Sequence, residues 1–287
     1  MRAIRVLNAI RSFSAVSCGY RLEDKMLIFL NRILHLSHPL NRSYILKYGK
    51  SLIVPSRLVN NFYCRNYYGI FKCPGGSSEL QFQQIYEPTV KEEMIRLRKG
   101  VFVDIGASIG LYTVMMSKLL EDKGQVISLE PHPTRFAALT ENIKINKCNN
   151  VTAINVAGWS KSDELRLYEH VFGGGSLDHS LMANSGRYVV VKAKRLDDIL
   201  KELNINKIGL IKIDVEGAEV NVLQGMKETL MKNTAQKIIF EAIKPENLTR
   251  ACEILRHFNY VTSPLDDGIH LAEYKSDSLS VSSCEER

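Results

Sequence analysis

The sequence predicts an α/β fold in which helices cover both faces of a mostly parallel sheet. Two observations support this prediction. From about residue 100 to 275, short apolar runs alternate with longer segments in which apolar residues recur at helical spacing. The apolar runs lack polar alternation, as expected of strands that are buried on both faces. A repeated strand-helix order places successive strands parallel to one another.

Each element follows from this periodicity. The predicted strands are 101–105, 126–129, 151–156, 208–213 and 237–241, and the predicted helices are 111–120, 133–146, 219–231 and 248–258. About fifty residues between the third and fourth strands do not follow this alternation of apolar runs and helical segments. There, 164–168 and 187–193 predict two antiparallel strands, with three glycines at 173–175 between them. Because such insertions often complete a binding site, we expect a lid on the substrate side.

The segment 1–85 is expected to form a basic extension. Residues 1–100 contain 16 Lys and Arg against 6 Asp and Glu, whereas the rest contains 22 against 25. A helix over 22–34, short strands at 52–54 and 69–73, and a helix over 87–97 are predicted here. The first helix is amphipathic and basic, which fits a membrane surface, its own domain or a second subunit. A solvated basic face explains the charge equally well.

The expected domain boundaries follow from these differences in residue pattern and charge. They are an extension over 1–85, a catalytic domain over 86–276 with an insertion at about 160–195, and a flexible tail over 277–287. No apolar stretch is long enough to cross a bilayer, and Arg2, Arg5 and Arg11 interrupt the N-terminal segment, so no signal peptide is predicted. The six cysteines are scattered, which favours reduced thiols and no zinc site. We therefore expect a cytoplasmic protein, with peripheral contact at the inner membrane surface left open.

A glycine-rich turn follows the first buried strand of the domain. The letters DIGASIG at 104–110 lie between the strand and the next helix. Glycines allow a sharp turn and close approach of a ligand, and a helix N-terminus offers unpaired N–H groups. Ligands of open α/β sheets bind beyond the carboxyl ends of the strands. Such turns also occur for packing reasons alone.

An acid at the end of the second strand narrows the choice of ligand. Glu130 ends this strand, and a carboxylate at that position can accept both hydroxyls of a ribose. Dinucleotide turns require G-x-G-x-x-G to hold a pyrophosphate, but only Gly106 and Gly110 are present here. The pattern therefore favours a nucleoside cofactor without phosphates. The alternative for Glu130 is a surface acid before a proline turn.

Charged residues crowd the end of the fourth strand. The letters KIDVEGAE at 212–219 hold three carboxylates and a lysine, with Lys212 and Asp214 on the same side of the strand. Like charges raise some pKa values and can create a general base. Acids in a first helical turn also complement the helix dipole, which accounts for Glu219 more readily than for the whole cluster.

These blocks together resemble a known family. VDIGASIGLYT, LEPHPTRFAALTENIKIN, NVAGWS, GGGSL, LIKIDVEGAEVNVLQG and IIFEA occur in this order between about residues 86 and 274. They are similar to FkbM-type methyltransferases, which are class I, Rossmann-like enzymes that use S-adenosylmethionine. The resemblance implies O-methylation, often of sugar or polyketide hydroxyls.

The resemblance also implies a role for each matching residue. The methionine part of the cofactor would be lined by Asp104, Gly106, Ala107 and Gly110. Glu130 would hold the ribose with His132 nearby, and Asn155 to Ala157 would flank the adenine. Asp214 and Glu216 would face the methyl group and the acceptor, and Glu241 ends the fifth strand at the same edge.

Methylation of a hydroxyl requires a proton acceptor. The candidates are, in order, Asp214, Glu216, Glu241 and His132, and Lys212 would stabilise negative charge or pair with a carboxylate. A divalent metal such as magnesium on Asp214 and Glu216 is compatible with their chemistry, but two carboxylates alone do not establish one. No metal ligand is therefore assigned.

The predicted function is S-adenosylmethionine-dependent methylation, with a sugar, glycan or other small-metabolite hydroxyl as acceptor. Two alternatives stay open: a nicotinamide-dependent oxidoreductase, and a non-catalytic cofactor-binding scaffold whose basic region binds a membrane or polymer. A nucleic-acid methyltransferase is disfavoured, because no N/D-P-P-Y motif follows the fourth strand and no basic stripe interleaved with aromatics occurs in the domain.

Overall fold

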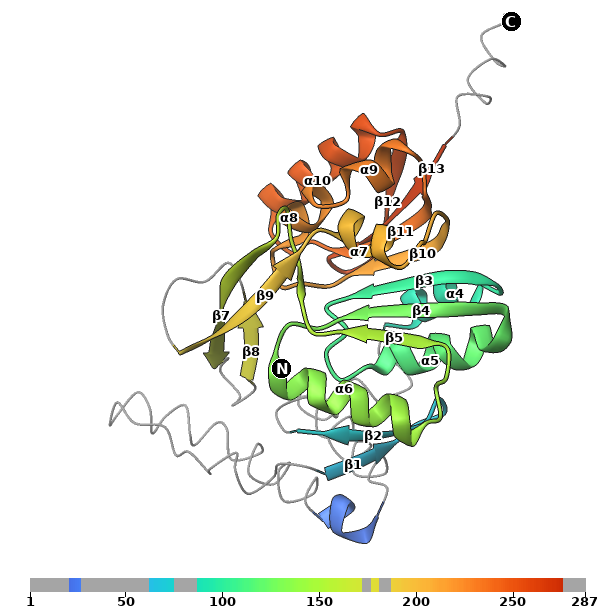
Figure 1. The fold of residues 1–287 in the computed structure, drawn as a ribbon, viewed down its shortest axis with the longest axis vertical. Helices are drawn as coiled ribbons and strands as arrows, with labels where there is room; N and C mark the ends of the chain where they lie inside the picture. Colours follow the sequence, from blue (N-terminus) through green and yellow to red (C-terminus); the bar gives the residue numbers. More distant parts are fainter. Residues whose placement is uncertain (1–20, 27–61, 75–86, 172–176, 181–186, 276–287) are drawn as a thin grey trace, which may run out of the picture.

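The fold is built on one large sheet (Figure 1). A computed structural model describes residues 21–26, 62–74, 87–171, 177–180 and 187–275. Within them, a seven-stranded sheet has the order β12-β13-β11-β10-β3-β4-β5. The strands from β11 to β5 are mutually parallel, and β13 is antiparallel to both of its neighbours. The predicted α/β class with a mostly parallel sheet is therefore confirmed.

The strands of this sheet are β3 (Gly100–Ile105), β4 (Gly124–Leu129), β5 (Val151–Ile154), β10 (Ile208–Ile213), β11 (Ala235–Glu241), β12 (Tyr260–Asp266) and β13 (Ile269–Tyr274). The helices are α4 (Pro88–Ile95), α5 (Leu111–Leu120), the 3-10 helix η3 (Glu121–Lys123), α6 (Pro133–Ile145), α7 (Leu196–Glu202), α8 (Glu219–Gln224), α9 (Lys227–Met231) and α10 (Pro245–His257). All five predicted strands are present. The hairpin β12–β13 was not predicted, because β12 is a half-exposed edge strand that contains Pro264.

Apolar side chains cover both faces of the sheet. One face packs against α7, α8, α9 and α10, where Val103 and Ile105 of β3 join the largest cluster of buried residues. The other face packs against α4 and α5, where Phe102 joins a second cluster. Successive residues of β3 are therefore buried on opposite sides, which explains the unbroken apolar run in its sequence.

The strand order reverses between β3 and β10. From β3 the chain moves to β4 and then β5, whereas β10 and β11 extend the sheet in the opposite direction. The chain therefore leaves the neighbouring ends of β3 and β10 toward opposite edges of the sheet. In open α/β sheets this switch point is where ligands bind. The residues after β3 and β10 are those that the sequence singled out.

The helix predicted over 219–231 is two helices, so this prediction was wrong. α8 ends at Gln224 and α9 begins at Lys227. A Cβ at Gly225 would lie 1.8 Å from the backbone oxygen of Trp159, so the chain needs a glycine at this close approach. α10 begins at Pro245 rather than at 248, because proline is favoured in the first turn of a helix.

A small hairpin packs on the outer side of α6. Its strands are β1 (Phe62–Arg65) and β2 (Ile70–Cys73), and β2 matches the predicted strand over 69–73. Lys72 bonds Glu141 through its side chain (2.6 Å) and Asn142 through its backbone N–H (2.6 Å). The described part of the N-terminal region is thus joined to the catalytic domain by specific polar contacts.

Only residues 22–26 of the predicted amphipathic helix are described. Within them Leu22 and Met26 are exposed, whereas Asp24 is buried and accepts the backbone N–H of Tyr63 at 2.9 Å. The rest of that helix, the predicted strand over 52–54, the glycines at 173–175 and the tail over 277–287 lie outside the described residues. The domain boundaries and the membrane contact stay predictions.

The insertion after β5 forms a second sheet. Its strands are β6 (Ala157–Gly158), β7 (Asp163–Val171), β8 (Leu177–Ser180) and β9 (Tyr188–Lys194), in the order β6-β9-β7-β8. The two predicted antiparallel strands correspond to β7 and β9. In Figure 1 this sheet lies beside the end of the large sheet at which β3, β4 and β5 finish. Its position is compatible with the predicted role on the substrate side.

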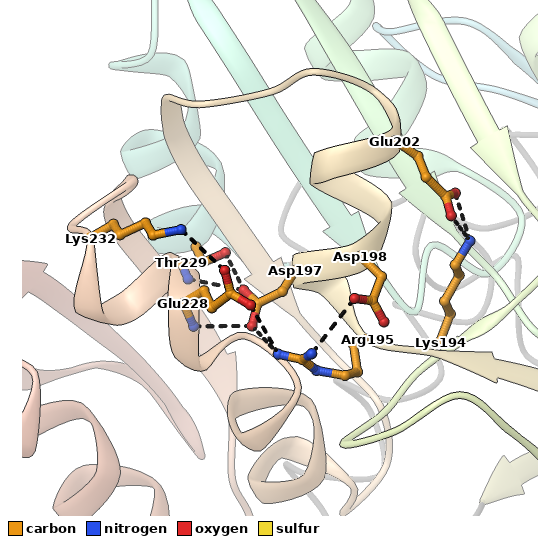
Figure 2. A network of polar contacts seen from close by, with 8 residues as sticks. All are labelled: Lys194, Arg195, Asp197, Asp198, Glu202, Glu228, Thr229 and Lys232. Atoms are coloured by element: carbon orange, nitrogen blue, oxygen red, sulfur yellow. Dashed lines mark hydrogen bonds and ion pairs between the residues drawn. The ribbon is translucent and has the colours of Figure 1, made fainter.

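A polar network anchors the end of the insertion to the core (Figure 2). Asp197 is buried and accepts the backbone N–H groups of Glu228 (3.0 Å) and Thr229 (2.9 Å), which caps α9 from outside. The Arg195 guanidinium pairs with the same carboxylate at 2.7 Å. Beside it, Lys194 pairs with Glu202 at 2.6 Å. The point where β9 returns to the domain is therefore tied to both α7 and α9.

Candidate functional site

The turns after β3 and β10 contact each other through their backbones. The backbone N–H of Asp214 donates to the carbonyl of Ile105 at 3.0 Å. Gly106 has φ of +85°, and a Cβ there would lie 1.8 Å from the carbonyl oxygen of Asp214. Glycine is therefore required at position 106 both by its dihedral angle and by this contact. The predicted cofactor turn and the predicted reacting edge are thus one structural unit.

The other predicted residues of the glycine turn are held by internal contacts. Gly110 has φ of +89°, and a Cβ there would lie 2.5 Å from the Leu139 side chain on α6. The backbone N–H groups of Gly106 and Ala107 both donate to the carbonyl of Leu129, at 2.9 and 3.0 Å. The N–H groups of these two turn residues are therefore engaged within the protein. Gly110 has a packing role in addition to any contact with the cofactor.

Glu130 connects the glycine turn to the next loop. Its carboxylate is 4% exposed and accepts the backbone N–H of Ser108 on one oxygen and that of His132 on the other, both at 2.8 Å. Burial raises the pKa of Glu130, while the nearby charge of Arg135 lowers it. Each carboxylate oxygen retains a second lone pair, which can accept a ribose hydroxyl. His132 itself is buried.

The predicted adenine-flanking residues lie just beyond β5. Asn155 is exposed, and its side-chain amide donates to the carbonyls of Glu130 (2.7 Å) and Pro131 (3.0 Å). Ala157 is buried at the start of β6. Asn155 therefore fixes the turn that presents Glu130, which is a structural contribution that the motif alone did not indicate.

A buried polar row crosses three strands below the glycine turn. Asp104 is 1% exposed and accepts the hydroxyl of Thr113 at 2.7 Å, and Thr113 in turn lies 2.8 Å from the hydroxyl of Ser128. Lys212 on β10 is opposite Asp104 in the register. Burial raises the pKa of Asp104, and the Lys212 charge opposes that rise. The Asp104 carboxylate is therefore held in place by the hydroxyl of Thr113 and by the charge of Lys212.

Lys212 is the central cation of the site. It is 4% exposed and pairs with Asp214 at 2.7 Å. Its ammonium lies 4.9 Å from the centroid of the Tyr112 ring, and the Tyr112 hydroxyl donates to Glu87 at the start of α4. Burial alone would lower the pKa of Lys212, but the charges of Asp214, Glu87 and Asp104 raise it above its usual value. Lys212 therefore stays charged.

Three carboxylates meet beside Lys212. One oxygen from each of Asp214, Glu216 and Glu241 lies within 4.8 Å of the others. Burial and the Asp214 charge raise the pKa of Glu241 to about 9, so Glu241 is protonated at neutral pH and donates a hydrogen bond to Asp214. Burial would raise the pKa of Asp214, but Lys212 and the bond from Glu241 lower it. The pair therefore shares one proton.

Glu216 is presented by a constrained turn. It has φ of +51°, an uncommon conformation for a residue with a side chain, and Gly217 follows with φ of +100°. The buried Glu219 carboxylate accepts the backbone N–H of Gly217 at 2.8 Å. Glu219 thus shapes the turn, as helix N-terminal chemistry predicts. Backbone strain of this kind occurs preferentially at functional sites.

The structure therefore brings together most of the predicted residues. Asp104, Gly106 and Asp214 are joined directly or through Lys212, and Glu216 and Glu241 adjoin them. Sequence reasoning missed the part played by Tyr112, Thr113 and Ser128, although the first two lie within the block VDIGASIGLYT. Carboxylates outnumber the single lysine here, which suits a cationic ligand such as S-adenosylmethionine. Three carboxylates are also a donor set that a divalent cation accepts.

The comparison with protein families decides the identity. The model of the Methyltransferase FkbM domain matches residues 104–262. The protein belongs to the FkbM methyltransferase family. The match contains the glycine turn, Glu130 and the carboxylate cluster. The resemblance inferred from the sequence blocks is therefore confirmed. The protein is an S-adenosylmethionine-dependent methyltransferase, and the nicotinamide-dependent alternative is not supported.

Three curated relatives are 24% to 27% identical to this chain. Methyltransferase 1 of Beauveria bassiana is 24% identical over 60% of this chain and 77% of its own length. The 31-O-demethyl-FK506 methyltransferase FkbM of Streptomyces tacrolimicus is 27% identical over 53% and 70%. The hexuronic acid methyltransferase AglP of Haloferax volcanii is 27% identical over 56% and 66%.

Among solved structures, the FkbM methyltransferase of Methylobacillus flagellatus is 15% identical to this chain, with a TM-score of 0.46. The alignment covers 95% of this chain and 60% of that one. In the part of this chain that the structure describes, no helix is long and apolar enough to span a membrane.

Proposed function

We propose that this FkbM-family protein transfers a methyl group from S-adenosylmethionine to a hydroxyl of a sugar, glycan or other small metabolite. The observation that carries the proposal is the carboxylate cluster of Asp214, Glu216 and Glu241, which adjoins the glycine turn through the backbone contact between Gly106 and Asp214. Two relatives are named for acceptors of this kind, a hexuronic acid and an O-demethyl form of FK506.

We assign the cofactor to the turn after β3 and the end of β4. Glu130 would accept the two ribose hydroxyls, Asn155 and Ala157 would flank the adenine, and the turn from Asp104 through Gly106, Ala107 and Gly110 would line the methionine part. Both oxygens of Glu130 are already oriented by backbone N–H groups. A preorganised carboxylate loses little conformational entropy when it binds a diol, so we expect it to contribute strongly to affinity.

The proton is assigned to the carboxylate cluster. When bound, S-adenosylmethionine supplies an electrophilic methyl group on a positively charged sulfur. The acceptor hydroxyl donates a hydrogen bond to Asp214, whose carboxylate is ionised at neutral pH because Lys212 lowers its pKa. The proton that the acceptor hydroxyl loses on methylation would pass to Asp214. Glu241, already protonated, holds Asp214 in place through its hydrogen bond.

Glu216 and His132 have secondary roles in this proposal. Glu216 is the exposed member of the cluster, so it is suited to bind the acceptor rather than to hold the proton. His132 is buried, and its backbone N–H is engaged by Glu130. We therefore place His132 beside the ribose and rank it last among the bases.

The assignment is tested with Asp214→Asn. Asparagine keeps the size of the side chain but cannot take up the proton. Methylation of hydroxyl acceptors, followed with methyl-labelled S-adenosylmethionine and a cell extract, should fall at least about 100-fold, which is the usual contribution of a general base. Cofactor affinity should change little. Full activity in this variant would remove Asp214 as the base and leave Glu216, Glu241 and His132 as candidates.

Retained cofactor binding with no labelled acceptor from any extract would support the non-catalytic scaffold instead. A metal role is tested in the same assay by adding a chelator. Loss of activity that magnesium restores would assign a cation to Asp214, Glu216 and Glu241.

A further inference from the structure

One face of the insertion sheet carries an aromatic pair with a fixed cation. Tyr168 on β7 and Tyr188 on β9 are direct cross-strand partners, with ring centroids 5.6 Å apart and ring planes 54° apart. The Arg166 guanidinium lies 4.8 Å from the centroid of Tyr188. A hydrogen bond to Tyr168 raises the pKa of Arg166. The guanidinium is therefore oriented by both tyrosines.

This face lies outside the hydrophobic core. The alternate residues Leu167 and Val191 are buried on the opposite side of the sheet. Tyr188 is 46% exposed and its neighbour on the same face, Val190, is 58% exposed. Large apolar side chains grouped on an exposed strand face are uncommon without a binding role, because they favour aggregation.

The charge between β7 and β9 on this face is positive. Glu164 on β7 is opposite Lys192 on β9 in the register, so their charges offset each other. Arg166 is opposite the apolar Val190, so its charge has no acidic cross-strand partner between these two strands. A guanidinium has five N–H donors in a rigid planar group, and it binds a carboxylate through two parallel hydrogen bonds.

These features fit one kind of ligand. A pyranose ring has an apolar C–H face that packs on an aromatic ring, and its burial contributes in the same way as any apolar area. A sugar with a carboxylate would place that group on Arg166 while its ring packs on Tyr188. A neutral sugar would use the rings alone.

The insertion is anchored at the edge that holds the proposed active site. β6 follows closely after β5, and a Cβ on its Gly158 would lie 2.9 Å from Ile105, the last residue of β3. The backbone N–H of Trp159 donates to the carbonyl of Lys194, which closes the base of the insertion at 3.0 Å. Figure 1 shows the insertion sheet at this end of the large sheet.

We propose that Arg166, Tyr168 and Tyr188 form an acceptor-binding subsite for a carboxylate-bearing sugar. The inference rests on the proposed function, since it names the class of acceptor that the methyltransferase takes. It does not require the methylated hydroxyl to belong to the sugar unit that contacts these three residues.

The test uses the full chain without cofactor and two defined probes. A hyaluronan tetrasaccharide supplies glucuronic acid, and maltotetraose is the neutral counterpart. Binding is measured by calorimetry and by saturation-transfer NMR. The acidic probe should bind at least about tenfold more tightly than the neutral one, the ratio expected when a charged hydrogen-bonded pair contributes about 1.4 kcal/mol.

Two variants that should lose affinity, one conservative variant and one control follow. Arg166→Gln and Tyr188→Ala should each weaken binding of the acidic probe about tenfold, whereas Tyr188→Phe should retain it. Val261→Ala removes an exposed apolar side chain from β12 and should change nothing. Because Arg166 and Tyr188 are exposed, all variants should keep the melting temperature of the parent protein.

Several results would overturn the inference. They are no binding of the acidic probe, equal binding of both probes, or binding that neither variant alters. A dimer in sedimentation velocity that Tyr188→Ala dissolves would assign the face to a second copy of the chain instead. If the parent protein bound the acidic probe but not S-adenosylmethionine, the proposed function would be contradicted while the sugar subsite would remain supported.

Discussion

Replacement of Lys212 by methionine isolates the charge at the centre of the site. Methionine keeps most of the length of the side chain and its apolar packing, but it removes the ammonium that pairs with Asp214 at 2.7 Å. Lys212 is 4% exposed and Asp104, its neighbour in the register, is 1% exposed. The substitution therefore leaves two carboxylates, one of them deeply buried, without their counter-ion.

The expected cost is large because Lys212 and Asp104 are buried and Asp214 is half-buried. Removal of one partner of a buried ion pair costs about 3 to 5 kcal/mol, since the remaining charge is neither solvated nor compensated. In the variant, the pKa of Asp104, which burial already raises, should rise further, and the pKa of Asp214 should rise above that in the unfolded chain. The folded variant then binds more protons than the unfolded chain, so its stability deficit should be smaller at pH 5 than at pH 8.

Urea denaturation at both pH values measures this deficit. Lys232→Met is the control, because Lys232 pairs with Glu228 at the surface and should cost no more than about 1 kcal/mol. The double variant Lys212→Met/Asp214→Asn should recover part of the loss. A deficit below about 1 kcal/mol for Lys212→Met, or one that does not change with pH, would refute the account of Lys212 as the charge that holds the site.

Three further predictions concern the elements around the site. Gly106→Ala should destabilise the protein by about 2 to 3 kcal/mol, because it combines a positive φ with a clash against the carbonyl of Asp214, and a thermal melt unchanged from the parent would contradict this. Asp197→Ala should lower the free energy of unfolding, measured by urea denaturation, by about 2 to 4 kcal/mol, since it removes the buried cap of α9. The control Asp198→Ala, at a half-buried position, should lower it by less than about 1 kcal/mol. Equal losses in the two variants would reject the capping role. The pKa of Glu241 is raised to about 9, so the free energy of unfolding that its protonated form contributes is lost as pH rises toward 9. In buffer with a chelator, Glu241→Gln should show a smaller loss of stability over this pH range. An equal loss in both proteins would show that Glu241 is not protonated.

The parts of the fold that could be predicted are those with strong local signals. The buried strands β3, β4, β10 and β11 are largely apolar, and each occurs close to where the sequence places it. The hairpin β12–β13 escaped prediction because an edge strand carries polar residues and Pro264. The break between α8 and α9 at Gly225 was not predicted for another reason, since it depends on the backbone of Trp159, which lies far away in the sequence, directly after β6.

The candidate site was predictable to a similar degree. Contiguous motifs identified Asp104, Gly106 and Asp214 because each lies at or directly after the end of a strand, at the edge where ligands bind. Their mutual contacts could not be read from the motifs. The packing of Gly110 on Leu139, and the use of both Glu130 oxygens by backbone N–H groups, depend on how separate loops meet in space.

Calorimetric titration with S-adenosylmethionine tests the central claim most directly. The parent protein should bind the cofactor at a single site, and Glu130→Gln should weaken binding at least about tenfold, because an amide accepts hydrogen bonds from the ribose hydroxyls less strongly than a carboxylate. A thermal melt confirms that the variant is folded. Absence of binding in the parent protein, or unaltered affinity in folded Glu130→Gln, would contradict the placement of the cofactor at the turn after β3.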